Sequence, residues 1–166
     1  DEQKRFGYED VKKWCEGEFV RIKDNSIYSE DDFEEENAEP DPLVFGIFDD
    51  RIVTVGSLRE LAGAIAENWN HTKKQLKRTP FFEFIAQFDA NLEKDIREYS
   101  KLADEDQAVF YTLYRIRKNP NLIYKGVDYG GAKDFVNSLN SEITDDMRAI
   151  INNDLFEFYL KVNGYE

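Results

Sequence analysis

The sequence predicts an α+β fold that is mostly α-helical, in which two repeated modules, each a β-hairpin plus helices, are joined by a helical pair. Two pairs of short apolar runs are each interrupted by a short polar turn, which is typical of β-hairpins. Elsewhere apolar residues recur every three to four positions, the period of amphipathic helices. Because a similar succession of patterns follows both hairpins, we expect one supersecondary unit used twice.

Composition limits the classes of function. Of the 166 residues, 41% are hydrophobic and 14% aromatic, which is enough to form a core and excludes a wholly disordered chain. The net charge of −13 opposes non-specific binding to nucleic acid and to anionic membranes, and we expect neither partner. No apolar run approaches the roughly 20 residues of a membrane span. The single cysteine, Cys15, excludes an internal disulfide, is expected to be a buried small hydrophobe, and favours a cytoplasmic setting.

Residues 1–24 are predicted to form a helix and a short strand. Val11, Trp14 and Cys15 follow helical spacing, and Gly17 is suited to end that helix. The next residues, Glu-Phe-Val-Arg-Ile at 18–22, contain three apolar positions and predict a short extended piece.

Residues 25–42 are predicted to form an acidic linker. Within them, residues 30–41 contain eight acidic and no basic residues, and Pro40 and Pro42 close the segment. Such a block of like charges favours a solvated path, so we expect neither helix nor strand over most of residues 30–41. A calcium-binding loop is the alternative interpretation, but the segment lacks the central glycine of that pattern.

Residues 43–89 are predicted to form the first hairpin–helix module. The apolar runs 43–48 and 51–55 flank an Asp-Asp turn and predict the hairpin. Ser57 and Glu60 then have the spacing of a capping box, which marks the beginning of a helix.

That helix is predicted to continue to Trp69, where its apolar stripe ends. Thr79 and Pro80 predict the beginning of the next helix, with Thr79 as N-cap and a buried face that includes Phe84. Residues 90–119 are predicted to form a helical connector, because two successive stripes of apolar residues lie within them.

Residues 120–166 are predicted to form the second hairpin–helix module. Two short apolar runs flank Lys125 and Gly126 and predict a tighter hairpin, and Thr144 is suited to cap a later helix. Three short helices are expected near residues 132–140, 145–152 and 154–162.

The repeat is visible when the chain is aligned with itself at an offset of 74 residues, and we expect residues 47–89 and 121–163 to superpose. The best stretch aligns Phe-Phe-Glu-Phe-Ile, beginning at residue 81, with Leu-Phe-Glu-Phe-Tyr, beginning at residue 155. Chance agreement between amphipathic helices is the alternative, because any two helices share one period. The matched Glu83 and Glu157 are either functional or, more simply, solvent-facing positions between buried aromatic residues.

The motifs of the sequence assign no catalytic, cofactor-binding or metal-binding residue. Gly130 and Gly131 lack the downstream Lys and Ser/Thr of a phosphate-binding loop, and a turn or helix cap explains them better. Acidic residues are so abundant that no general acid–base pair stands out. His71 is expected on an exposed helical face.

One cationic cluster is a candidate interaction patch. It comprises Trp69, Lys73, Lys74, Lys77 and Arg78. Such a cluster is suited to contact nucleic acid, a phosphopeptide or an acidic protein surface. The alternative is a solvated helical face whose charge balances the chain's own acidic segment, which is how charge runs usually behave.

The chain opens with Asp-Glu-Gln-Lys-Arg, from Asp1 to Arg5, followed by Val11 and a predicted helix. This arrangement resembles the end of the catalytic domain of eukaryotic-like Ser/Thr protein kinases, where Asp-Pro-x-x-Arg precedes an apolar residue and the closing helix. Asp1, Arg5 and Val11 match that pattern, and Glu2 stands where the family has proline. The resemblance covers about a dozen residues and implies a structural role for Arg5, which in the family pairs with an acidic residue.

Together these observations predict a non-catalytic accessory or regulatory region, C-terminal to a protein kinase domain in a bacterial, cytoplasmic protein. We expect it to bind a partner protein or its own kinase domain and to need no cofactor. None of the family's ATP-binding, catalytic-loop or metal-binding motifs occurs in this sequence. The alternative is a stand-alone small enzyme that depends on a carboxylate, or a ligand-binding domain.

Overall fold

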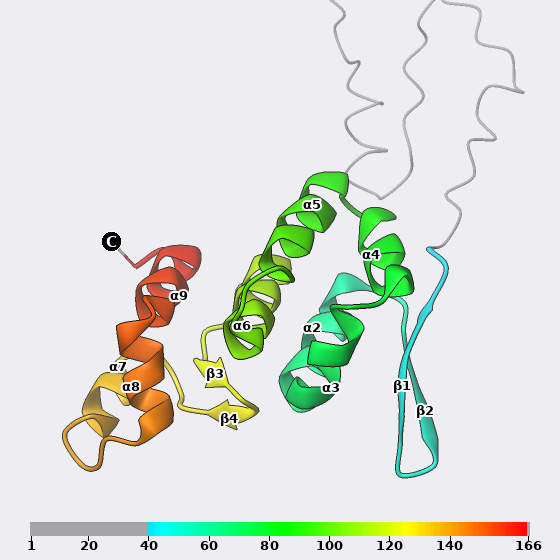
Figure 1. Cartoon of the computed structure of the whole chain (residues 1–166). Helices are drawn as coiled ribbons and strands as arrows, with labels where there is room; N and C mark the ends of the chain where they lie inside the picture. The colour runs from blue at the N-terminus through cyan, green and yellow to red at the C-terminus, as the bar shows by residue number, and fades with distance from the viewer. Residues whose placement is uncertain (1–39, 166) are drawn as a thin grey trace, which may run out of the picture. The chain divides into compact units, whose positions relative to one another are not determined.

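The computed structural model describes residues 40–165 (Figure 1). The helix and strand predicted within residues 1–24, and the acidic segment 30–41 except for its last two residues, lie outside the described residues. The described part contains eight helices and two antiparallel two-stranded sheets, so it is α+β and mostly helical, as predicted.

The first half consists of a hairpin and three helices: β1 (Leu43–Phe48), β2 (Arg51–Val55), α2 (Leu58–Glu67), α3 (Trp69–Gln75) and α4 (Thr79–Ala86). A helical pair follows: α5 (Ala90–Tyr99) and α6 (Glu105–Ile116). The last part is again a hairpin and three helices: β3 (Ile123–Tyr124), β4 (Val127–Asp128), α7 (Ala132–Ser138), α8 (Asp145–Asn152) and α9 (Leu155–Asn163).

Both hairpins close through two-residue turns in which the two central residues have positive φ. The angles are 47° and 61° at Asp49 and Asp50, and 52° and 78° at Lys125 and Gly126. Positive φ at both positions characterises the type I′ turn, whose twist matches that of the flanking strands. Aspartate and glycine tolerate this conformation better than most residues do, which explains why these short polar stretches turn the chain.

Two of the predicted helix caps, at Ser57 and Thr144, are confirmed. The Ser57 hydroxyl accepts a hydrogen bond from the Glu60 N–H at 3.2 Å, and the Glu60 carboxylate accepts one from the Gly56 N–H at 2.7 Å. The Thr144 hydroxyl accepts from the Met147 N–H at 3.2 Å and begins α8. These contacts satisfy backbone donors that the first helical turn leaves unpaired.

Two features of the helices of the first module differ from the prediction. The apolar stripe that leads to Trp69 is divided between α2 and α3, because Asn68 leaves the helical conformation with φ −124° and ψ 54°. The Asn68 side-chain amide donates to the Ala64 carbonyl at 3.0 Å and so competes with the helix backbone. In α4, Thr79 is already helical and the extended Arg78 is the N-cap.

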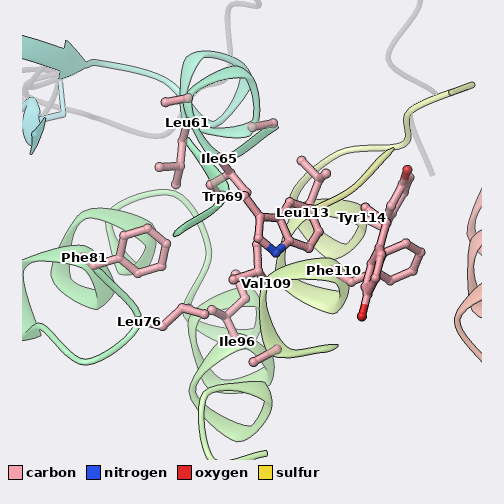
Figure 2. Close-up of a cluster of buried hydrophobic side chains, with 14 of the residues drawn as sticks. Leu61, Ile65, Trp69, Leu76, Phe81, Ile96, Val109, Phe110, Leu113 and Tyr114 are labelled. Atoms are coloured by element: carbon pink, nitrogen blue, oxygen red, sulfur yellow. The ribbon is translucent and has the colours of Figure 1, made fainter. Parts of the chain in front are cut away.

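The core centres on α6, which contacts α2, α3, α5, β3 and α9. Figure 2 shows the Trp69 indole among Ile65, Val109 and Leu113. On the other side of α6, the rings of Tyr111 and Phe158 lie 4.7 Å apart, as centroid separations, and connect α6 to α9. The helical connector is therefore the shared centre of the core, rather than a spacer between two separate modules.

The order of hairpin followed by three helices occurs twice, but one offset does not describe both copies. Helices α2 and α7 begin at residues 58 and 132, which are 74 apart, whereas the turns begin at Asp49 and Lys125, which are 76 apart. The strands have six and five residues in the first hairpin and two each in the second. Phe84 and Phe158 both lie in the third helix after their hairpin, and Phe84 is the more deeply buried.

Candidate functional site

Trp69, the aromatic residue of the predicted cationic patch, is buried in the core. Trp69 is only 3% exposed, and its ring lies edge-on to Tyr124 with centroids 5.7 Å apart. The indole Nε1 donates to the Asp106 carboxylate at 2.8 Å. Trp69 therefore packs α3 against α6 and is not available as a surface residue, which corrects its placement in the interaction patch.

Two of the four cationic side chains are paired with acidic residues of the first turn of α6. The Lys73 ammonium lies 2.6 Å from the Asp106 carboxylate, and the Lys77 ammonium forms an ion pair with Glu105. The hydrogen bond from Lys77 is the main reason that the pKa of Glu105 is lowered, and the positive charge of Lys77 adds to it. Lys74 and Arg78 are exposed and form no ion pair with another described residue. Two of the four positive charges of the patch are therefore balanced by acidic residues of α6.

His71 lies against the first hairpin rather than on an exposed helical face, which corrects the prediction. Its Nε2 is 2.7 Å from the Phe45 carbonyl oxygen, and its ring contacts Phe45 and Phe48 with centroids 5.4 and 4.9 Å away. Gln75, one turn further along α3, donates to the same carbonyl at 2.5 Å. Histidine and glutamine four residues apart share a helix face, a signal that sequence reasoning missed.

The Phe45 carbonyl needs these donors because Phe45 lies at a β-bulge. Val44 pairs with Thr54 and Gly46 with Val53, which leaves Phe45 without a partner in β2. The Phe45 ring is fully buried. Just before β1, the Asp41 N–H donates to the Gln87 side-chain oxygen at 2.7 Å. Side chains of α3 thus bond the bulge carbonyl of β1, and Gln87, the residue that follows α4, bonds the chain just before β1.

Within residues 40–165, no side chain bonds the outer edge of β2. In a hairpin with a two-residue turn, the pair next to the turn is hydrogen-bonded, here Phe48 with Arg51, and the next pair, Ile47 with Ile52, is not. The N–H and C=O of Ile52, and of Thr54 two residues later, therefore point away from β1. This sheet has no third strand among residues 40–165.

Beside this open edge, the outer face of the hairpin is aliphatic. Val44, Ile47 and Ile52 are 55, 67 and 66% exposed, and Ile47 and Ile52 are directly opposite each other. We call these three side chains together with the outward backbone groups of Ile52 and Thr54 the β2 edge surface. A signal for it exists in the sequence, because the two strands are apolar at nearly every position instead of alternating. Such strands are usually covered on both faces.

A small cavity of about 240 Å³ lies between α2 and the segment that follows α6. Its floor is formed by small residues of α2, including Gly63, and Arg117 and Lys118 contribute cationic side chains. No carboxylate lines it, so it offers no acid–base pair to a carboxylate-dependent enzyme.

A strongly perturbed hydroxyl, that of Tyr114, has a structural role. Burial raises the pKa of Tyr114, whose hydroxyl donates to the Asn121 carbonyl at 2.7 Å and accepts from the Ile123 N–H at 2.8 Å. These bonds fix the chain between α6 and β3, so the hydroxyl already has both its partners.

Within the part of the chain that the structure describes, no group of three or more His, Cys, Asp and Glu side chains is arranged to hold a metal ion. No helix of that part is both long and apolar enough to span a membrane. Compared with known proteins, the chain matches no protein family, no curated protein and no solved structure.

Proposed function

We propose that this chain is a non-catalytic protein-interaction region that a protein kinase carries C-terminal to its catalytic domain. The observation that supports the interaction role is the β2 edge surface, where three large aliphatic side chains are exposed beside backbone groups that no strand within residues 40–165 pairs. Each square ångström of apolar surface left in water forgoes about 25 cal/mol of stabilisation. A cluster of such residues beside an open strand edge is typical of a surface that another chain covers.

The kinase context is supported by the residues at the beginning of the chain. Asp1, Arg5 and Val11 match the pattern that closes the catalytic domain of eukaryotic-like Ser/Thr kinases. The partner is then another protein or the kinase domain itself. Nucleic acid is disfavoured, because the chain has a net charge of −13 and two of its clustered lysines are already paired with Glu105 and Asp106.

We also propose that the two hairpin–helix halves are divergent copies of one unit. Both have a type I′ turn, and helices α2 and α7 begin 74 residues apart. The central Phe-Glu-Phe of α4 recurs in α9, with Glu83 and Glu157 both exposed. In this interpretation the second hairpin has become shorter, and the first one retains the surface used for interaction.

The non-catalytic role is tested by titrating the purified chain with Mg-ATP in a calorimeter and by assaying phosphotransfer to a generic protein substrate. Phosphoryl transfer requires a phosphate-covering loop, a positioned lysine and metal-binding acids, so we expect neither binding heat at millimolar ligand nor transfer. Saturable binding that Lys74→Ala abolishes would overturn the proposal.

The kinase context has its own test, which is the gene sequence upstream of the codon for Asp1. We expect it to encode a kinase catalytic domain with a glycine-rich loop, a catalytic-loop aspartate and a metal-binding aspartate. An unrelated domain, or a start codon directly upstream, would contradict this part of the proposal and would leave the interaction role to be judged separately.

A further inference from the structure

We infer that the open edge of β2 accepts an extended, aliphatic and basic segment of a partner protein as a third strand of the first sheet. This inference rests on the proposed interaction role and specifies the kind of partner. In this recognition mode, backbone hydrogen bonds supply affinity and alternate side chains supply specificity.

The two edges of the hairpin differ in a way that selects one of them. On β1 the bulge carbonyl of Phe45 is already bonded by His71 and Gln75, and the Asp41 N–H is bonded by Gln87. Natural sheets protect edges with such bulges and covering side chains. On β2 there is no bulge and no proline, and the outward groups of Ile52 and Thr54 are aligned to exchange hydrogen bonds with an added strand.

The outer face of the hairpin explains why the added strand should be aliphatic. A strand beside β2 places alternate side chains on the same face as Ile52, which lies opposite Ile47. Aliphatic side chains at those positions would cover Ile52 and extend the apolar face beyond it. The buried inner face, with Phe45 and Val55, already packs against helices and does not need a partner.

Charge explains why the added strand should be basic. The turn of the hairpin carries Asp49 and Asp50, and Asp41 precedes β1, whereas Arg51 is the one basic residue between residues 40 and 55. The whole chain has a net charge of −13. Basic side chains at the alternate, solvent-facing positions of the added strand would therefore be attracted to this end of the molecule.

The same charge argues against a second copy of this chain as the occupant, because two copies would each bring a net charge of −13. The surface area available at the edge also argues against a second copy. A stable dimer buries about 800 Å² on each partner, which is far more than a five-residue strand edge and three aliphatic side chains provide. A short basic segment of a different protein is the better match.

The experiment uses the whole chain and a fluorescein-labelled peptide, Lys-Val-Lys-Ile-Lys-Val-Lys with blocked ends, in an anisotropy titration. We expect saturable binding that is at least about tenfold weaker for the peptide with glutamate in place of lysine, since about 1.4 kcal/mol corresponds to tenfold. A third peptide, N-methylated at alternate residues, keeps charge and side chains but removes the donors of one edge. We expect it not to bind.

Protein variants locate the contact. Thr54→Pro removes an outward N–H without removing a hydrogen bond to β1, a position that a strand edge tolerates. We expect Thr54→Pro and Ile52→Thr to weaken peptide binding at least about tenfold, a loss of about 1.4 kcal/mol. The matched control is Val127→Thr, because Val127 is an exposed aliphatic residue of the other hairpin, and we expect binding to be unchanged. Circular dichroism checks that each variant folds, and the N-methylated peptide tests the edge without altering the protein.

Several results would overturn the inference: no binding by the lysine peptide, equal binding by the N-methylated peptide, or equal binding to folded Thr54→Pro. A dimer in light scattering that Ile52→Thr dissociates would identify a second copy as the occupant and would also overturn it. A native protein partner that binds the wild type and folded Thr54→Pro equally would contradict only the inference, and the proposed interaction role would stand.

Discussion

The indole Nε1 of Trp69 donates a hydrogen bond to the carboxylate of Asp106 at 2.8 Å, although 37 residues separate them in the chain. The same carboxylate oxygen lies 2.6 Å from the ammonium of Lys73. Asp106 thus joins α3 to the first turn of α6 by two contacts. A buried indole N–H needs an acceptor, and this requirement accounts for the position of Asp106 beside the core.

Replacing Asp106 should therefore destabilise the fold. Asp106→Ala leaves the Trp69 N–H without a partner, and we expect a loss of about 1–3 kcal/mol in the free energy of unfolding, measured by urea denaturation. Asp106→Asn retains an acceptor and should lose less. As a control, Glu98→Ala removes only an exposed pair with Lys101 and should change the free energy by at most about 0.5 kcal/mol. Equal losses for Asp106→Ala and Glu98→Ala would contradict this role.

Replacing Gly46 and Gly63 with alanine should change the stability of the fold in opposite directions. A Cβ at Gly46 would lie 2.7 Å from the His71 Nε2 and 2.9 Å from the Phe48 ring. We expect Gly46→Ala to destabilise the fold by about 1–3 kcal/mol, because His71 is held by the bulge carbonyl and cannot move freely. Gly63, inside α2, has open space around it, so Gly63→Ala should stabilise the protein by about 0.5–1 kcal/mol. Thermal denaturation of the two variants checks both signs.

The two faces of the first hairpin should differ sharply in their effect on stability. Phe45 is fully buried, and Phe45→Ala should cost about 3–5 kcal/mol. Ile52 is exposed, and Ile52→Thr should stay within about 0.5 kcal/mol of the wild type. Denaturant titration measures both values. A loss for Ile52→Thr comparable to that for Phe45→Ala would mean that the outer face is part of the core after all.

The ion pair between Lys77 and Glu105 should be visible in a pH titration. Lys77 lowers the pKa of Glu105 in the folded protein, so the pair stabilises the fold above the unfolded-state pKa, and this contribution is lost as pH falls through the lowered folded-state pKa. We expect Lys77→Met to raise the Glu105 pKa toward its ordinary value, measured by NMR of the side-chain carboxyl. Lys74→Met, which removes an exposed neighbour, should move it less. Identical pKa values in the wild type and Lys77→Met would refute the pairing.

Local features of this fold could be predicted from the sequence because their signals lie within a few residues. The Asp49–Asp50 turn depends on two adjacent residues that tolerate positive φ. The caps at Ser57 and Thr144 depend on side chains that bond to nearby backbone N–H groups.

Features that depend on distant partners could not be predicted in this way. Trp69 has the residue type of an interaction surface, but its acceptor lies on α6. His71 meets a carbonyl that a bulge 26 residues earlier leaves free. The β2 edge surface has a local signal, the absence of alternation in two apolar strands, but only the tertiary structure shows that no described element covers it.

Amide hydrogen exchange of the whole chain, resolved residue by residue by NMR, tests most directly whether the β2 edge is open. We expect the Ile52 and Thr54 amides to exchange much faster than those of Arg51 and Val53, because only the latter two are at positions that bond to β1. On adding the lysine peptide, Ile52 and Thr54 should become protected while Arg51 changes little. Strong protection of Ile52 and Thr54 in the free protein would show that the edge is already paired, and would contradict the account.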